Sequence, residues 1–89
     1  MRVPVYARQF ERDLKRARKR GKHLDKLKMI ARALIEGERL DPLHRDRRLV
    51  GSYTGRRGCH IEADWLLIYK LEKGRVVFER TGSRADLFE

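Results

Sequence analysis

The chain changes its hydrophobic period near Leu49, and this change limits the folds it can adopt. Before that point, apolar residues recur three and four positions apart, as in amphipathic helices. After it, short apolar runs separated by glycine-containing turns are typical of antiparallel strands. Helices followed by strands predict an α+β domain in which the helices cover one face of the sheet. The other face is expected to stay open to solvent.

Two helices are predicted in the first half of the chain. Residues 7–20 form a basic amphipathic pattern, and residues 24–36 carry a wider apolar stripe that ends near Gly37. Residues 2–6 precede them with an alternating apolar pattern, and Pro4 restricts that strand to a sheet edge or a strand start. This part of the chain is therefore read as a short edge strand followed by a helical hairpin.

The second half predicts a three-stranded antiparallel meander. A polar connector, residues 40–48, leads into glycine-rich extended pieces up to residue 61, then the apolar run "DWLLIYKL", a turn at "EKG" and the strand "RVVFERTG". The middle strand is expected to be central. The tail returns two large apolar side chains, Leu87 and Phe88.

Size and charge restrict the classes of function. With 89 residues the chain is expected to form a single domain, residues 1–89, with any active site on its surface. No secretion signal or membrane span is recognisable, so a cytoplasmic protein without membrane contact is expected. The net charge is +10, and residues 1–48 hold sixteen basic and seven acidic side chains. Such a field attracts nucleic acids, acidic proteins or anionic membranes alike.

His60 and Asp64 stand out because they directly precede the apolar run of the central strand. A turn near Glu62 and Ala63 would bring the two side chains together across a hairpin, and in one continuous strand they would still share a face. A histidine near a carboxylate is suited to general acid–base chemistry, although such a pair is more often a surface hydrogen bond at a turn. The pattern alone leaves both explanations open.

Metal and thiol chemistry are not indicated. The three histidines are far apart in sequence and no pair has zinc-ligand spacing, so neither a metal site nor a cofactor is predicted. Cys59 is the only cysteine, which excludes an intramolecular disulfide. In an apolar-flanked strand it is expected to pack as a small hydrophobic residue rather than to act as a nucleophile.

Over nearly its whole length, the chain resembles the YafQ branch of the RelE-like (RelE/ParE) toxins of bacterial toxin–antitoxin systems, most specifically in its second half. The likeness is carried by "GSY" followed by glycine and arginine, by "H-x-E-x-D-W-x-L-I-Y-K", by "FERTG" and by the final "LF". It implies a RelE-like fold and a metal-independent, ribosome-dependent endoribonuclease that cleaves translated mRNA by 2′-hydroxyl attack. It also implies a cognate antitoxin as partner, and contact with the 16S RNA of the 30S A site.

The resemblance assigns site residues one by one. The catalytic histidine and aspartate of the family fall on His60 and Asp64, the adjacent aromatic on Trp65, and the C-terminal aromatic on Phe88. Two further family histidines fall on arginines, Arg47 and Arg84. Because arginine stays protonated, it can stabilise a phosphorane-like transition state but cannot readily transfer protons. His60 and Asp64 then remain as titratable candidates near neutral pH, with Asp64 favoured as base and His60 as acid.

Basic side chains of the predicted first helix, of the turn after it and of the glycine-flanked loop are expected to contact RNA phosphates. The predicted set is Arg12, Lys15, Arg16, Lys19, Arg20, Lys22, Arg56 and Arg57. Two other functions would use the same charge without catalysis. One is a basic RNA-binding or ribosome-binding module, and the other is a protein-interaction domain with an acidic partner. The His60, Asp64, Arg84 and Phe88 constellation separates the nuclease from both, because binding does not require it.

Overall fold

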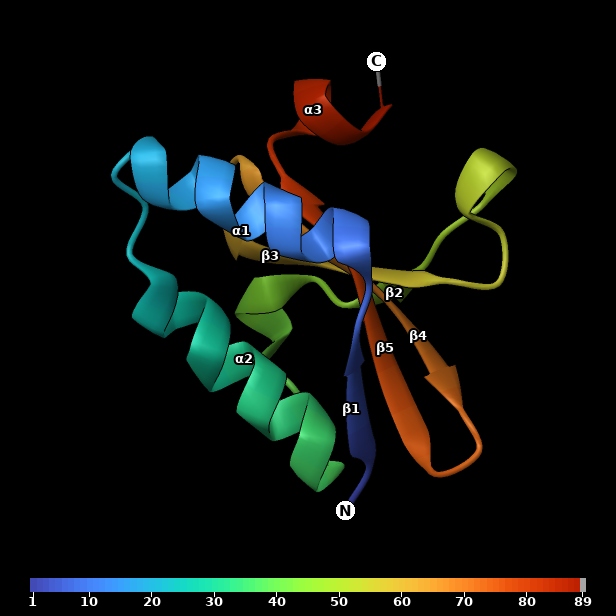
Figure 1. The fold of residues 1–89 in the computed structure, drawn as a ribbon. Helices are drawn as coiled ribbons and strands as arrows, with labels where there is room; N and C mark the ends of the chain where they lie inside the picture. Colours follow the sequence, from blue (N-terminus) through green and yellow to red (C-terminus); the bar gives the residue numbers. More distant parts are fainter. Residues whose placement is uncertain (89) are drawn as a thin grey trace.

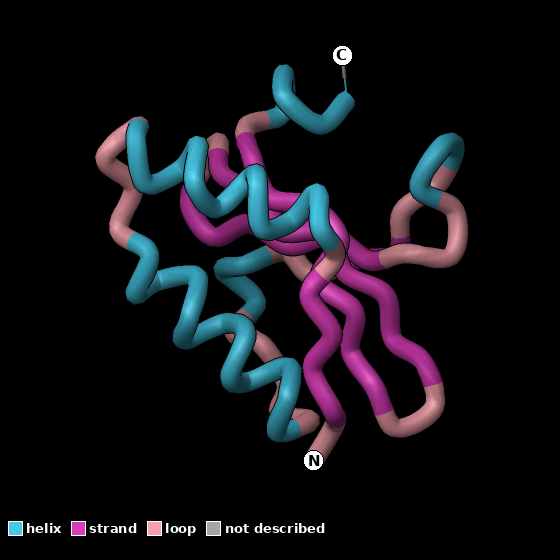
Figure 2. Tube along the Cα trace, viewed as in Figure 1, coloured by secondary structure: helices cyan, strands magenta, loops and turns pink. Residues whose placement is uncertain are grey.

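The structure is a computed structural model that describes residues 1–88, and it combines a five-stranded sheet with three α-helices (Figures 1 and 2). In chain order the elements are β1 (Val3–Tyr6), α1 (Arg8–Lys19), α2 (Leu24–Glu36), β2 (Arg47–Arg48), β3 (Arg57–Glu62), β4 (Trp65–Glu72), β5 (Arg75–Gly82) and α3 (Arg84–Phe88). Two single-turn 3₁₀ helices, η1 (Pro42–His44) and η2 (Gly51–Tyr53), flank β2. Between residues 1 and 88, no helix is long and apolar enough to cross a membrane.

The sheet has the strand order β1-β5-β4-β3-β2, with β4 at its centre. The strands from β2 to β5 pair antiparallel, whereas β1 pairs parallel with β5 at one edge. The predicted edge strand, the meander and the central position of "WLLIYKL" are confirmed. The two-residue strand β2, which lies inside the polar connector, was not predicted, because two charged residues carry no hydrophobic pattern.

Helices α1 and α2 pack on the same face of the sheet, as predicted (Figure 1). The bounds of α2 match the prediction, and the helix ends where Gly37 adopts a left-handed backbone with φ of 77°. Phe10 of α1 and Leu34 of α2 are buried against Trp65, Leu67 and other residues on this face of the sheet. Burial of these apolar stripes, rather than helix propensity, holds the two helices in place.

The opposite face of the sheet is only partly open, and here the expectation of a solvent-exposed face was wrong. Leu66 and Ile68 point to that face and are fully covered. Their cover comes from Leu49, Tyr53 and Leu87, which form a second, smaller core with them. The central strand is apolar on both sides, so each face needs a cover, and the chain supplies the second one from η2 and α3.

A buried carboxylate connects α1 to the end of β5. The side chain of Asp13 is 1% exposed and accepts hydrogen bonds from Arg80 Nε at 2.8 Å and from the Thr81 backbone N–H at 3.1 Å. The Thr81 hydroxyl in turn donates to the Leu66 carbonyl and accepts from the indole N–H of Trp65 at 2.9 Å. This network fixes the last residues of β5, from which the chain enters α3.

Candidate active site

The turn between β3 and β4 places His60 and Asp64 at one end of the sheet. β3 ends at Glu62, the turn occupies Ala63 and Asp64, and β4 begins at Trp65, which excludes the alternative of one continuous strand. His60 lies opposite Leu66 in the ladder, on the sheet face that α1 and α2 leave free. Within residues 1–88, no hydrogen bond joins the side chains of His60 and Asp64.

Each of these two side chains contacts another group. The His60 ring nitrogen Nδ1 lies 3.3 Å from the Ala63 carbonyl oxygen. The Asp64 carboxylate accepts a hydrogen bond of 2.9 Å from the backbone N–H of Arg84, the first residue of α3. Asp64 therefore connects the β3–β4 turn to the helix that carries Arg84 and Phe88.

Helix α3 was not predicted, although the sequence contains a signal for it. In "SRAD", the Ser83 hydroxyl accepts from the Asp86 backbone N–H at 3.1 Å, and the Asp86 carboxylate accepts from the Ser83 N–H at 2.9 Å. This reciprocal pair is a capping box, which marks a helix start. The helix turns the predicted tail so that Leu87 is buried while Phe88 stays 42% exposed.

Asp86 also ties α3 to α1. Arg20 donates to both Asp86 carboxylate oxygens, at 2.6 and 3.2 Å. This hydrogen bond, with those from Ser83, holds the pKa of Asp86 well below its usual value. A methyl group at Gly82 would lie 2.9 Å from the Asp86 side chain, so the close approach requires glycine. The position of Arg84 is thus set by contacts from α1, from the β3–β4 turn and within α3 itself.

Two pockets meet at Arg84. One, of about 500 Å³, is lined by His60 and Arg84 together with His44, Lys26 and Glu62 among others. The other, of about 580 Å³, is lined by Arg47, Arg48, Leu49, Val50, Arg84 and Phe88. The structure therefore gathers four predicted residues, His60, Arg84, Arg47 and Phe88, around adjoining pockets. Phe88 packs edge-on against Tyr53, with ring centroids 5.3 Å apart, and leaves part of its ring exposed.

His44 is a residue that reasoning from the sequence did not assign to the site. It ends the single turn η1, and its ring nitrogen Nδ1 lies 2.7 Å from the main-chain carbonyl oxygen of His60. The two histidines are sixteen residues apart, and no local pattern links them. Their proximity arises because η1 packs beside β3.

Trp65 does not take the predicted place beside the bases. Its side chain is 1% exposed and belongs to the core under α1 and α2, with its N–H bonded to Thr81. A buried indole cannot stack on a nucleotide, so the role of Trp65 is structural. Lys22 covers the ring from outside, with its ammonium group 5.7 Å from the ring centroid.

The predicted set of phosphate-binding residues is also revised. Five of its members are paired with carboxylates: Arg16 with Asp13, Arg20 with Asp86, Lys22 with Glu62, Arg56 with Glu79 and Arg57 with Asp46. These hydrogen bonds raise the pKa of Arg20, Arg56 and Arg57 and compensate their charges inside the protein. The other three, Arg12, Lys15 and Lys19, are exposed on α1 and have no ion pair within residues 1–88.

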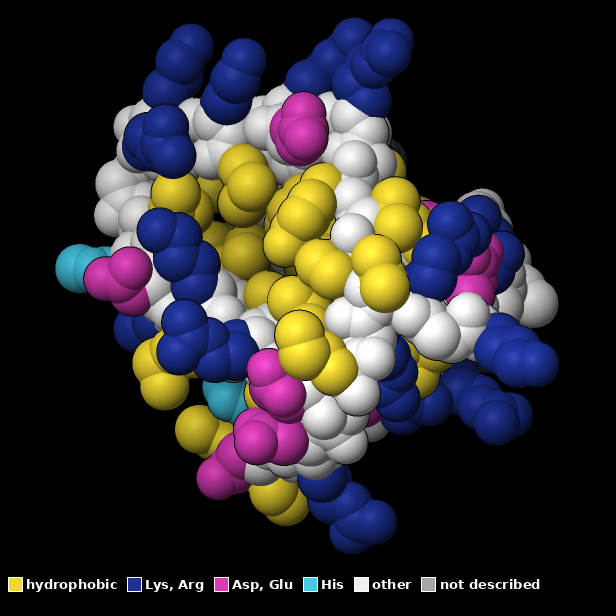
Figure 3. Space-filling model, turned by 60° about the horizontal axis from the view of Figure 1, so that its bottom comes forward, with side chains coloured by type: hydrophobic (Ala, Val, Ile, Leu, Met, Phe, Trp, Pro, Cys, Tyr) yellow, Lys and Arg dark blue, Asp and Glu magenta, His cyan; other side chains and the backbone are white. Residues whose placement is uncertain are grey.

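Apolar side chains lie on the same side of the molecule as the free charges of α1. Figure 3 shows basic side chains at the rim of the molecule and a continuous apolar band below them. Tyr6 of β1 is 49% exposed and stacks on Phe10 of α1, and Leu14 and Ile35, half-buried on α1 and α2, pack against the same core. Tyr6, Leu14 and Ile35 are called the apolar band here, and none of them lines the two pockets that meet at Arg84.

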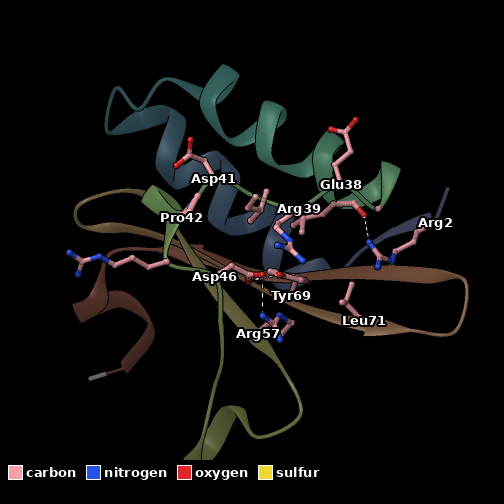
Figure 4. A pocket seen from close by; sticks show the side chains of 13 residues that line it. Arg2, Glu38, Arg39, Asp41, Pro42, Asp46, Arg57, Tyr69 and Leu71 are labelled. Carbon is pink, nitrogen blue, oxygen red and sulfur yellow. Dashed lines mark hydrogen bonds and ion pairs between the residues drawn. The ribbon is translucent and has the colours of Figure 1, made fainter.

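A further pocket, of about 630 Å³, lies at the other end of α2 (Figure 4). Within it Asp46 accepts hydrogen bonds from the Tyr69 hydroxyl and from Arg57, at 3.1 Å for the arginine. Burial and the bond to Asp46 raise the pKa of Tyr69. Cys59 is fully buried on the adjacent strand, and desolvation raises the pKa of its thiol to about 12. The predicted packing role of Cys59 is therefore confirmed.

Comparison with known proteins shows the family to which this chain belongs. A family model described as a bacterial toxin of a type II toxin-antitoxin system, YafQ, matches residues 2–89. The mRNA interferase toxin YafQ of Escherichia coli strain K12 is 44% identical over 84 residues, which cover 93% of this chain and 91% of the relative. The chain belongs to the YafQ toxin family.

Solved YafQ structures share the complete fold. The crystal structure of YafQ from E. coli strain BL21(DE3) has a TM-score of 0.95 at 42% identity, with all of both chains covered. A YafQ chain in the crystal structure of the E. coli DinJ-YafQ complex has a TM-score of 0.93 at 42% identity, again over both whole chains. The resemblance to YafQ and the α+β, RelE-like architecture predicted from the sequence are both confirmed.

Proposed function

We propose that this chain is the toxin of a type II toxin–antitoxin system, an mRNA interferase that cuts translated messages in the ribosomal A site. Membership in the YafQ family supports this proposal, because the E. coli relative is named an mRNA interferase toxin. The observation that carries it is the gathering of His60, Arg84, Arg47 and Phe88 around two adjoining pockets. A module that only binds RNA needs basic charge, not an imidazole and an exposed aromatic ring beside two arginines that form no ion pair within residues 1–88.

The proposed reaction uses the RNA's own 2′-hydroxyl. The 2′ oxygen attacks the adjacent phosphorus, and the bond from phosphorus to the 5′ oxygen of the next nucleotide breaks. One protein group accepts the 2′-hydroxyl proton and another protonates the departing 5′ oxygen. His60 is one of these groups, and the sequence named Asp64 as the other. Arg84 and Arg47 stabilise the negative charge that develops on the phosphorane, and Phe88 stacks on a base.

The decisive experiment uses purified ribosomes programmed with a defined message. The wild-type protein should give products with a 5′-hydroxyl and a 2′,3′-cyclic or 3′-phosphate. His60→Ala should slow cleavage by about 10² to 10⁴ while ribosome binding is largely retained. His23→Ala is the matched control, because His23 is exposed at the start of α2 and lines neither pocket.

Two results would contradict the proposal in different ways. Products with a 3′-hydroxyl and a 5′-phosphate would exclude 2′-hydroxyl attack. Ribosome binding without any cleavage by the wild-type protein would favour the non-catalytic binding module.

The free charges of α1 are proposed to contact RNA phosphates at the ribosome. Neutralising Arg12, Lys15 and Lys19 together should weaken binding and reduce the slope of log affinity against log salt by about two to three. A charge-matched control neutralises three exposed basic residues in and after α2: Lys28, Arg32 and Arg39. Equal changes in slope for both triple variants would show that total charge, and not the α1 surface, determines binding.

The partner of this chain is proposed to be a cognate antitoxin that carries acidic and apolar side chains. A DinJ-YafQ complex is known for the E. coli relative. Here, the apolar band of Tyr6, Leu14 and Ile35 lies on the side of the sheet that carries α1 and its free positive charges, and this combination suits an acidic amphipathic segment. Tyr6→Asp should weaken a co-expressed complex in the cytoplasm, whereas His23→Ala should not. Full retention of the complex in Tyr6→Asp would place the antitoxin elsewhere.

A further inference from the structure

His44 supplies a second imidazole to the pocket that contains His60. His44 and His60 line the same pocket, together with Arg84. The resemblance to the YafQ family predicts histidines at two further positions, but this chain has Arg47 and Arg84 there. Their guanidinium groups do not exchange protons near neutral pH. Among residues 1–88, His44 is the other imidazole that faces this pocket.

The hydrogen bonds of both rings determine which nitrogen is free. A carbonyl oxygen only accepts, so His44 Nδ1 must donate to the His60 carbonyl at 2.7 Å. His60 Nδ1 likewise faces the Ala63 carbonyl at 3.3 Å. Each neutral ring then carries its proton on Nδ1 and leaves the Nε2 lone pair available. Two imidazoles with free Nε2 atoms in one pocket are equipped to take one proton and give another.

The Asp64 carboxylate binds the start of α3 rather than facing this pocket. One of its carboxylate oxygens accepts the Arg84 N–H at 2.9 Å, and Asp64 is not among the residues that line the His44 and His60 pocket. Its side chain is therefore suited to hold the start of α3, and with it Arg84, at the edge of the pocket.

We propose that His44 is the partner of His60 in proton transfer, and that Asp64 acts as a positioning residue for Arg84. This inference rests on the proposed ribonuclease function. The neutral imidazole of one histidine accepts the 2′-hydroxyl proton as the new bond from the 2′ oxygen to phosphorus forms. The imidazolium of the other donates its proton to the 5′ oxygen as the phosphorus bond to that oxygen breaks. One proton is taken and one is given, so no further reactant is required.

The charged groups around the pocket come from every element that faces it. They are Lys26 of α2, Arg45 after η1, Glu62 of β3 and Arg84 of α3. Glu62 is paired with Lys26 at 2.8 Å and with Lys22 at 3.5 Å. The carboxylate that lines the pocket is thus paired with two lysines, and the two imidazoles are the lining side chains that can both accept and donate a proton.

The test compares His44→Asn, His60→Asn and the control His23→Asn in the programmed-ribosome assay. The asparagine amide can still donate from near the Nδ1 position, so the bond to the His60 carbonyl is kept while the Nε2 nitrogen is lost. We expect His44→Asn to slow cleavage by about 10² to 10⁴ and to remove one limb of the bell-shaped pH–rate profile. Ribosome affinity and thermal unfolding of the variant are measured in parallel, and His44→Gln is the second variant if His44→Asn does not fold.

A message with sulfur in place of the departing 5′ oxygen separates the two roles. A thiolate leaves without a proton, so the variant that lacks the acid should recover on this substrate and the variant that lacks the base should not. Recovery of one of His44→Asn and His60→Asn, but not of both, is the expected result.

Three results would overturn the inference. The first is His44→Asn cleaving at the wild-type rate. The second is a slower variant that keeps both limbs of the pH–rate profile. The third is an Asp64→Asn variant that loses one limb of the pH–rate profile while His44→Asn keeps both. In each case the wild-type protein still cleaves, so the proposed function survives; no cleavage by the wild-type protein would instead overturn the proposed function.

Discussion

Replacement of Asp13 by alanine should destabilise the protein strongly, although Asp13 lies outside the candidate site. Its carboxylate is 1% exposed and accepts hydrogen bonds from Arg80, from Arg16 and from the buried Thr81 N–H. Removing one partner of a buried ion pair costs about 3–5 kcal/mol because the other charge stays buried. The Arg80 side chain is 25% exposed and can be partly rehydrated, which reduces this cost. The Thr81 N–H, which loses its acceptor, adds about 1–3 kcal/mol.

With rehydration of Arg80 reducing the cost of its charge to about 1–2 kcal/mol, these contributions predict a loss of about 2–5 kcal/mol in the free energy of unfolding, or about 8–40 °C in Tm for a domain of this size. Urea denaturation followed by circular dichroism would measure it as a lower midpoint with an unchanged slope. Glu11→Ala, an exposed acidic change on the same helix, should alter stability by no more than about 0.5 kcal/mol.

The double variant Asp13→Ala, Arg80→Ala tests the cause. If the cost arises from an uncompensated Arg80 charge, the double variant should lose less stability than the sum of the two single changes. Additive losses, or an Asp13→Ala protein as stable as Glu11→Ala, would refute the reasoning.

Three further predictions concern the site and its supports. Asp64→Asn keeps an acceptor for the Arg84 N–H and should cleave at close to the wild-type rate. Asp64→Ala should cleave about tenfold to a hundredfold more slowly, because Arg84 is misplaced. Equal losses of cleavage rate in both variants would instead indicate a role for the negative charge. Folding lowers the pKa of Asp86, so its ionised carboxylate stabilises the folded protein at pH values above the usual carboxylate pKa of about 4. This stabilisation is lost as the pH falls from that value through the lowered pKa of the folded state. The stability difference between the wild-type protein and Asp86→Asn should therefore narrow in acid urea titrations, and a constant difference would contradict this. Cys59 should resist alkylation in the native protein and react once urea unfolds it, which mass spectrometry can follow; rapid native labelling would show that the buried strand opens.

The sequence by itself determined the elements whose patterns are local. The apolar stripe of α2 and the following Gly37 gave bounds that the structure reproduces. Pro4 predicted an edge strand, and the apolar run from Trp65 predicted the central one. The capping box at Ser83 was equally local, so α3 was within reach of the same reasoning. Helical and strand periods are properties of neighbouring residues, which is why a single sequence reveals them.

The tertiary structure alone decided which charges are free and which side chains share a pocket. Arg20 and Arg56 look like RNA ligands in the sequence, but carboxylates that are 66 and 23 residues away in the chain compensate them. His44 reaches the His60 carbonyl only because η1 packs against β3. Trp65 adjoins a predicted catalytic residue, yet strand alternation turns its ring into the core under α1 and α2. Pairing and burial depend on chain segments that meet only on folding, and no pattern along the sequence records them.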